Sequence, residues 1–166
     1  ECRDNEGVKV IIFSEWERML ELVRDLCRRL KLGFAWHTGS VPQQRRRAEI
    51  NAFKGDANCR VFLSTDSGST GLNLQNASVV INCDLPWNPA VLNQRIGRVH
   101  RLGQRNPVRV VNVVAKGTIE EGMLSVLAFK SSLFAGVLDG GAADIQLGGT
   151  RLNKFMESVE ATTSEI

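Results

Sequence analysis

The chain has 166 residues, of which 43% are hydrophobic and 23% charged, and its formal net charge is +3. This is the composition of an ordinary globular protein, and the length suits one domain with a real hydrophobic core. No apolar run approaches the roughly 18 residues of a membrane span and the first seven residues are polar, so we expect a cytoplasmic protein without membrane segments or a signal peptide.

The first part of the chain alternates short apolar runs with amphipathic stretches. Residues 8–14 (VKVIIFS) predict a strand buried on both faces, and residues 16–30 carry apolar side chains at helical spacing. A short strand is expected over residues 34–37, followed by a helix over 42–53 that Pro42 opens. The run over residues 60–65 predicts a third strand.

Two more strands are expected at residues 78–84 and 108–115, each preceded by a helix, and 118–121 (TIEE) is a capping box that starts a final helix. The alternation predicts an α/β fold, with a doubly wound, mainly parallel sheet flanked by helices and ligands at the carboxyl ends of the strands. We assign residues 1–130 to this domain and the glycine-rich residues 131–166 to a C-terminal appendage.

Cysteine and histidine do not form a metal-binding pattern. The four cysteines lie far apart without a C-x-x-C pair, and three of them sit among apolar neighbours, as reduced thiols of a cytosolic protein do. The histidines, His37 and His100, are equally isolated. We therefore predict no metal ion bound by protein ligands.

Positive charge is concentrated in one stretch of the sequence. No acidic residue lies between Asp84 and Glu120, and the stretch contains six cations: Arg95, Arg98, Arg101, Arg105, Arg109 and Lys116. Clustering of one sign is typical of a surface that faces phosphate, and a solvated helix face is the alternative.

The most informative segment is 94–104 (QRIGRVHRLGQ). On a helix, Gln94, Arg98 and Arg101 share one face, and an apolar stripe occupies another. We expect the stripe to dock on the sheet and the arginines to project outward, where guanidinium groups can bind a phosphoryl group in transfer. A basic face with salt bridges is the alternative, and this helix carries no acid to form them.

A glycine-rich turn follows the third predicted strand, over residues 63–74 (LSTDSGSTGLNL). Glycine lets backbone amides approach a phosphate closely, although most such turns are only turns. The position of Thr65 and Asp66 at the carboxyl end of a strand makes the phosphate-binding interpretation as strong as the structural one.

These segments resemble motifs of superfamily-two helicases. Residues 65–73 (TDSGSTGLN) are similar to motif V, and residues 94–101 (QRIGRVHR) are similar to motif VI. The segments 84–89 (DLPWNP) and 100–104 (HRLGQ) narrow the resemblance to the Swi/Snf family of DNA-translocating ATPases, and residues 85–89 (LPWNP) and 71–75 (GLNLQ) look like its bacterial branch. The resemblance runs from residue 11 to residue 121 and implies a RecA-like C-terminal helicase lobe.

The resemblance also implies roles for single residues. Arg98 and Arg101 match arginine fingers that reach ATP held by a partner lobe, and Gln94 matches the residue that orients them. Gly71 and Asn73 match positions near the nucleotide.

Contacts with DNA phosphates are implied for seven residues: Ser14, Thr38, Gly39, Ser40, Arg46, Thr65 and Trp87. Hydroxyls and helix-start amides suit phosphate contacts that position DNA without reading its sequence. For Trp87 a packed core aromatic is the alternative, and for Arg46 a solvated run. The chain departs from many family members at Asp66, where they carry arginine.

The sequence contains no P-loop (G-x-x-x-x-G-K-[ST]) and no Asp-Glu pair for magnesium. We therefore expect ATP and Mg²⁺ to be held mainly by an N-terminal RecA-like lobe of the same protein, and this chain alone to be inactive. The implied function is the C-terminal motor lobe of an ATP-dependent double-stranded DNA translocase in the bacterial nucleoid. Alternatives are a strand-separating DNA or RNA helicase, and a docking module for a protein such as RNA polymerase.

Overall fold

The computed structural model describes residues 2, 5, 7–66, 72–100, 107–124 and 127. The chain divides into two compact units. The first unit consists of residues 1–84 and 91–113, and the second of residues 85–90 and 114–166.

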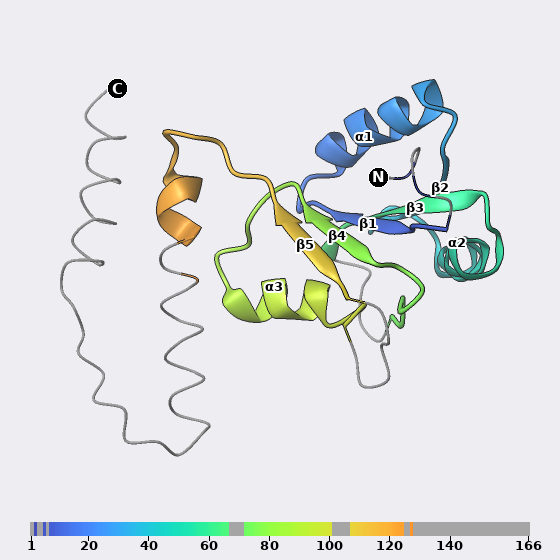
Figure 1. The fold of residues 1–166 in the computed structure, drawn as a ribbon. Coiled ribbons are helices and arrows are strands. Elements are labelled where there is room, and N and C mark those ends of the chain that lie inside the picture. The colour runs from blue at the N-terminus through green and yellow to red at the C-terminus, as the bar shows by residue number, and fades with distance from the viewer. Residues whose placement is uncertain are drawn as a thin grey trace, which may run out of the picture. The chain divides into compact units, whose positions relative to one another are not determined.

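The first unit is built on a parallel sheet with the strand order β2-β3-β1-β4-β5 (Figure 1). The strands are β1 (Val10–Phe13), β2 (Gly33–His37), β3 (Cys59–Ser64), β4 (Val79–Asn82) and β5 (Arg109–Asn112). Every pairing is parallel, so all carboxyl ends lie at one edge of the sheet. The central strand is β1, with β3 and β4 on its two sides.

Helices cover both faces of this sheet. The helices are α1 (Glu17–Arg29), α2 (Gln43–Gly55) and α3 (Pro89–Ile96). Figure 1 shows α1 on one side of the sheet and α2 on the other. Leu20 of α1 packs in a cluster with Leu63, whereas Phe53 of α2 packs in a second cluster with Phe62. Successive strand residues point to opposite faces, so β3 contributes to both layers, and the doubly wound prediction is confirmed.

Element boundaries differ from the predictions mainly at the ends. The strands β1, β4 and β5 are shorter than predicted, β2 is one residue longer, and β3 has the predicted length but begins one residue earlier. Residues 72–78, in the described part before β4, are not helical; residues 67–71, where the predicted helix would begin, lie outside the described residues. The final helix does follow Thr118, over residues 119–124.

Thr118 and Glu121 do not make the pair of bonds that a capping box requires. Glu121 accepts a hydrogen bond from the Gly117 amide at 3.0 Å, but the Thr118 hydroxyl donates to the Ala115 carbonyl at 2.7 Å instead of accepting from the helix. The glutamate therefore secures the turn that precedes the helix.

The cysteines are thiols in this structure. All four cysteines are free, and burial raises the pKa of the thiols of Cys27, Cys59 and Cys83. Within the described ranges, no three metal-ligating side chains gather, and no helix is long and apolar enough to cross a membrane.

Candidate functional site at the carboxyl edge of the sheet

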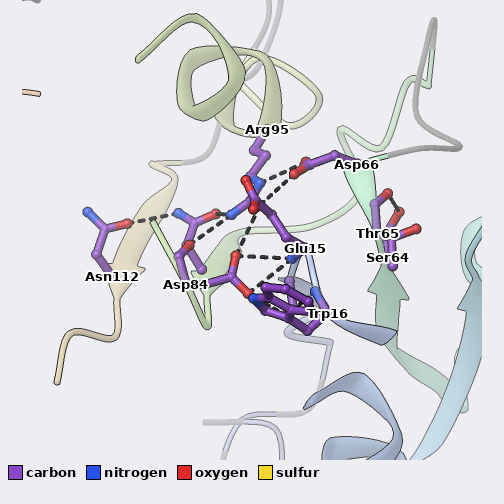
Figure 2. Close-up of polar contacts among 10 residues, drawn as sticks. Glu15, Trp16, Ser64, Thr65, Asp66, Asp84, Arg95 and Asn112 are labelled. Carbon is purple, nitrogen blue, oxygen red and sulfur yellow. Dashed lines mark hydrogen bonds and ion pairs between the residues drawn. The ribbon is translucent and has the colours of Figure 1, made fainter. Parts of the chain in front are cut away.

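Arg95 of α3 lies at the centre of an ion-pair cluster beside the carboxyl ends of the strands (Figure 2). Its side chain is 0% exposed, and its guanidinium donates to both carboxylate oxygens of Asp66, at 2.8 and 2.6 Å. It also donates to the carbonyl of Asp84 at 2.9 Å and to the Asp84 carboxylate at 3.2 Å. Burial alone lowers the pKa of Arg95, but the hydrogen bond and charge of Asp66, with those of Asp84, raise it overall. Arg95 is therefore held as a cation between two carboxylates.

Asp84 connects this cluster to the end of β1. Its carboxylate accepts a short hydrogen bond from the Ser14 hydroxyl and two bonds from the Glu15 amide, at 3.1 and 3.0 Å. Burial and the charge of Asp84 raise the pKa of Glu15. The Asn82 side chain extends the network to Asn112 of β5 at 2.8 Å. The residues that follow β1, β3 and β4 are thus tied to α3 through Arg95.

An open pocket of about 300 Å³ adjoins the cluster and is lined by Glu15, Thr65, Asp66 and Val91. The sequence interpretation did not assign a function to Arg95. The signal that could have indicated Arg95 was Asp66, the position where the chain departs from the resemblance. A carboxylate at this position can pair with a cation nearby in the fold.

Arg98 lies in the same layer, but the prediction that it projects outward is wrong: it is only 6% exposed. Its guanidinium carbon lies 5.9 Å from the centroid of the Phe13 ring. The helix α3 ends at Ile96, and the amides of Arg98 and Val99 donate to the third preceding carbonyls, at 3.4 and 3.0 Å. Arg98 therefore lies in a turn after α3, where the spacing of a continuous helix does not give the direction of its side chain. Gln94 is exposed on α3, and Arg101 lies outside the described residues.

The loop after β2 brings three of the predicted phosphate ligands together. Thr38 and Ser40 both donate their hydroxyls to one carboxylate oxygen of Glu17, at 3.0 and 2.7 Å. Thr38 is buried, whereas Gly39 and Ser40 are exposed. Arg46 of α2 donates to the carbonyl of Gly39 at 2.9 Å, so this arginine fixes the loop and is not merely a solvated cation.

The remaining predicted site residues lie apart from that loop. Thr65 is buried after β3, where its amide donates to the His37 carbonyl at 3.3 Å. Asn73 is exposed, and its side-chain oxygen accepts from the Gln75 amide at 3.3 Å. Gly71 lies outside the described residues. Trp87, in the second unit, is 56% exposed, so the alternative of a packed core aromatic is wrong.

Comparison with known proteins identifies this architecture. Residues 1–103 match the family described as helicase conserved C-terminal domain. The chain is 36% identical over 135 residues to the DNA repair protein RAD5A of Arabidopsis thaliana, which covers 81% of this chain and 13% of that protein. It is also 36% identical over 149 residues to the uncharacterized ATP-dependent helicase YqhH of Bacillus subtilis, covering 90% of this chain and 26% of that protein.

A Swi/Snf relative and a solved structure agree with these matches. The mouse SWI/SNF-related regulator of chromatin, subfamily A member 1, is 35% identical over 82% of this chain and 13% of its own length. The crystal structure of the C-terminal part of the Fun30 ATPase domain superposes with a TM-score of 0.67 at 30% identity, covering 72% of this chain and 39% of that one. The chain thus spans about a quarter or less of the curated relatives described above. It belongs to the helicase conserved C-terminal domain family, and its relatives include a Swi/Snf-related protein.

Proposed function

We propose that this chain is the C-terminal motor lobe of an ATP-dependent double-stranded DNA translocase. The observation that carries the proposal is the convergence of three motifs at one edge of the sheet. Ser14, Thr38 and Thr65 each follow the carboxyl end of a strand, and these strands are neighbours in the order β2-β3-β1. Ligands of doubly wound sheets bind at that edge.

In this proposal the DNA backbone lies along that edge. The exposed loop of Gly39 and Ser40, fixed by Arg46, offers amides and a hydroxyl to phosphates. Such contacts are sequence-tolerant and sensitive to salt. Because Ser14 and Thr38 already donate to carboxylates, phosphate would have to replace those acceptors.

ATP chemistry would be shared with an N-terminal lobe of the same protein. Arg98 and Arg101 would act as arginine fingers oriented by Gln94, and Gly71 and Asn73 would lie near the nucleotide. The nucleotide would bring Mg²⁺, to which we assign no ligand in the described residues. Since Arg98 is nearly buried against Phe13, it must leave that ring to reach a phosphate.

The decisive experiment substitutes the fingers in the full-length protein. Arg98→Ala and Arg101→Ala should each lower ATP turnover by about 10³-fold, because a finger stabilises charge that develops only in the transition state. DNA affinity should change little. Arg29→Ala, which removes an exposed cation from α1, is the matched control. Loss of DNA binding with turnover retained would instead assign these arginines to the DNA track.

Two alternatives remain distinguishable by experiment. A strand-displacement assay separates a translocase from a strand-separating DNA or RNA helicase. A docking module for RNA polymerase or another DNA-bound protein gains support from the exposed apolar side chains of Trp16 and Leu22 near and on α1. A pull-down that survives replacement of both arginines would favour docking.

A further inference from the structure

We infer that Arg95 is a positioning residue that links the DNA-facing end of β1 to the finger Arg98, and so makes ATP hydrolysis respond to DNA. This inference rests on the proposed function. It assigns Arg95 no contact with either ligand.

The first step is that Arg95 is rigidly oriented. Its planar guanidinium forms a bidentate pair with Asp66, at 2.8 and 2.6 Å, and it also reaches the carbonyl and carboxylate of Asp84. A guanidinium with several simultaneous acceptors cannot rotate without breaking one of its ion pairs. Lysine carries its charge on a single nitrogen and cannot make the same bidentate pair. A movement of the Asp66 or Asp84 carboxylate should therefore shift the guanidinium of Arg95.

The second step is that Asp84 is shared between Arg95 and the end of β1. Ser14 and the Glu15 amide donate to the same carboxylate that Arg95 contacts at 3.2 Å. Figure 2 shows Asp84 between Glu15 and Arg95. A phosphate that draws the Ser14 hydroxyl or the Glu15 amide competes with Asp84 for its donors. The carboxylate that loses one of these donors keeps the other and the guanidinium of Arg95, and we expect its interaction with Arg95 to strengthen.

The third step leads from Arg95 to Arg98. Both guanidinium groups lie over the ring of Phe13, with their central carbons 5.7 and 5.9 Å from its centroid. The Arg95 carbonyl also accepts the Arg98 amide at 3.4 Å. Phe13 is the last residue of β1 and directly precedes Ser14, so the ring that contacts Arg98 and the hydroxyl proposed to bind phosphate lie on adjacent residues.

A purely structural role is the competing explanation, and the test must separate the two. Breaking a buried ion pair destabilises a protein whatever its function. A matched control therefore has to remove a buried cation at the other edge of the sheet. Lys9, which precedes β1, is buried and donates to the Phe53 carbonyl and, at 2.7 Å, to the Asp56 carbonyl.

The experiment uses the full-length protein with Arg95→Lys, Asp84→Asn and Lys9→Met. The readout is the ratio of ATP turnover with saturating double-stranded DNA to turnover without DNA, measured together with Tm. We expect this ratio to fall about tenfold or more in Arg95→Lys and Asp84→Asn, within the usual range of coupling between two sites. In Lys9→Met the ratio should stay that of the wild type although Tm falls.

An unchanged ratio in Arg95→Lys, or an equal fall in Lys9→Met at matched Tm, overturns the inference. If Arg95→Lys does not fold, Asp66→Asn tests the same link, because it removes one carboxylate and leaves the guanidinium and Asp84 in place. Failure of the proposed function looks different: the wild-type protein would then show no stimulation by DNA at all.

Discussion

Glu17, the first residue of α1, binds the hydroxyls of Thr38 and Ser40, which we propose contact DNA phosphates. Its carboxylate accepts from Thr38 and Ser40, and a carboxylate at a phosphate site repels the ligand. We expect Glu17→Gln, which still accepts hydrogen bonds, to raise DNA affinity at least about threefold at low salt. The measurement is a DNA-binding titration at several salt concentrations.

Glu21→Gln is the control for that prediction. It removes the same charge one turn along α1, where Glu21 pairs with Arg18 at 3.0 Å and touches neither hydroxyl. If both variants raise DNA affinity equally, the effect of Glu17→Gln comes from the change in net charge and not from the contact of Glu17 with the two hydroxyls. Weaker binding by Glu17→Gln would mean that the carboxylate supports the loop in its binding conformation.

His37 is buried at the end of β2, with Nδ1 3.3 Å from the Ser64 hydroxyl. That hydroxyl donates to the Thr65 carbonyl at 3.0 Å, so the neutral ring donates from Nδ1. Burial, and then the charge of Arg46, lowers the pKa of His37 below its ordinary 6.5.

A lowered pKa means that the unfolded chain binds the proton first. The free energy of unfolding should therefore be constant with respect to His37 above pH 6.5 and fall below it, by at most about 1.4 kcal/mol per pH unit, until the folded pKa is reached. Urea titrations across this range test the prediction. His37→Gln should remove the slope, and His100→Gln, at an exposed position, should retain it.

At the scale of elements, the five strands and the helices α1 and α2 could be predicted because their apolar spacing is local, whereas the helix predicted before β4 is absent over residues 72–78. The end of α3 could not be predicted, because helical-face arithmetic assumes that the helix continues through Arg98. The Arg95–Asp66 ion pair could not be predicted from the sequence either, because the two residues are 29 positions apart and are brought together only by the order of the strands. The rule that ligands bind at the carboxyl ends of parallel strands did place Ser14 and Thr38 at the site. It could not show that the hydroxyls of these two residues already donate to carboxylates.

The start of β2 offers a test of packing between elements. A Cβ at Gly33 would lie 2.3 Å from the Asn58 carbonyl oxygen, whereas one at Gly55 would meet nothing within 4 Å. Gly33→Ala should destabilise the chain by about 1–3 kcal/mol, since backbone must shift. Gly55→Ala, in the last position of α2, should be neutral or stabilising by up to about 1 kcal/mol. Thermal unfolding of both variants decides, and equal Tm values would contradict this packing.

At the scale of the molecule, the chain contains the proposed fingers and no P-loop. We therefore expect the 166-residue chain alone to release no phosphate from ATP, with or without double-stranded DNA. A phosphate-release assay, with the full-length protein as the positive control, checks this. DNA-stimulated turnover by the chain alone would refute its assignment as one lobe of a shared site.

The Arg95–Asp66 pair also constrains how the sequence can change over generations. Replacing Asp66 by arginine would place two guanidinium groups together, and replacing Arg95 first would remove the cation that both oxygens of the Asp66 carboxylate accept from. Breaking one side of a fully buried pair costs about 3–5 kcal/mol, and because the Asp66 side chain is 27% exposed, the cost here should lie toward or below the low end of that range. Positions 66 and 95 are therefore expected to be inherited as a unit, so that the residue at either one foretells the residue at the other.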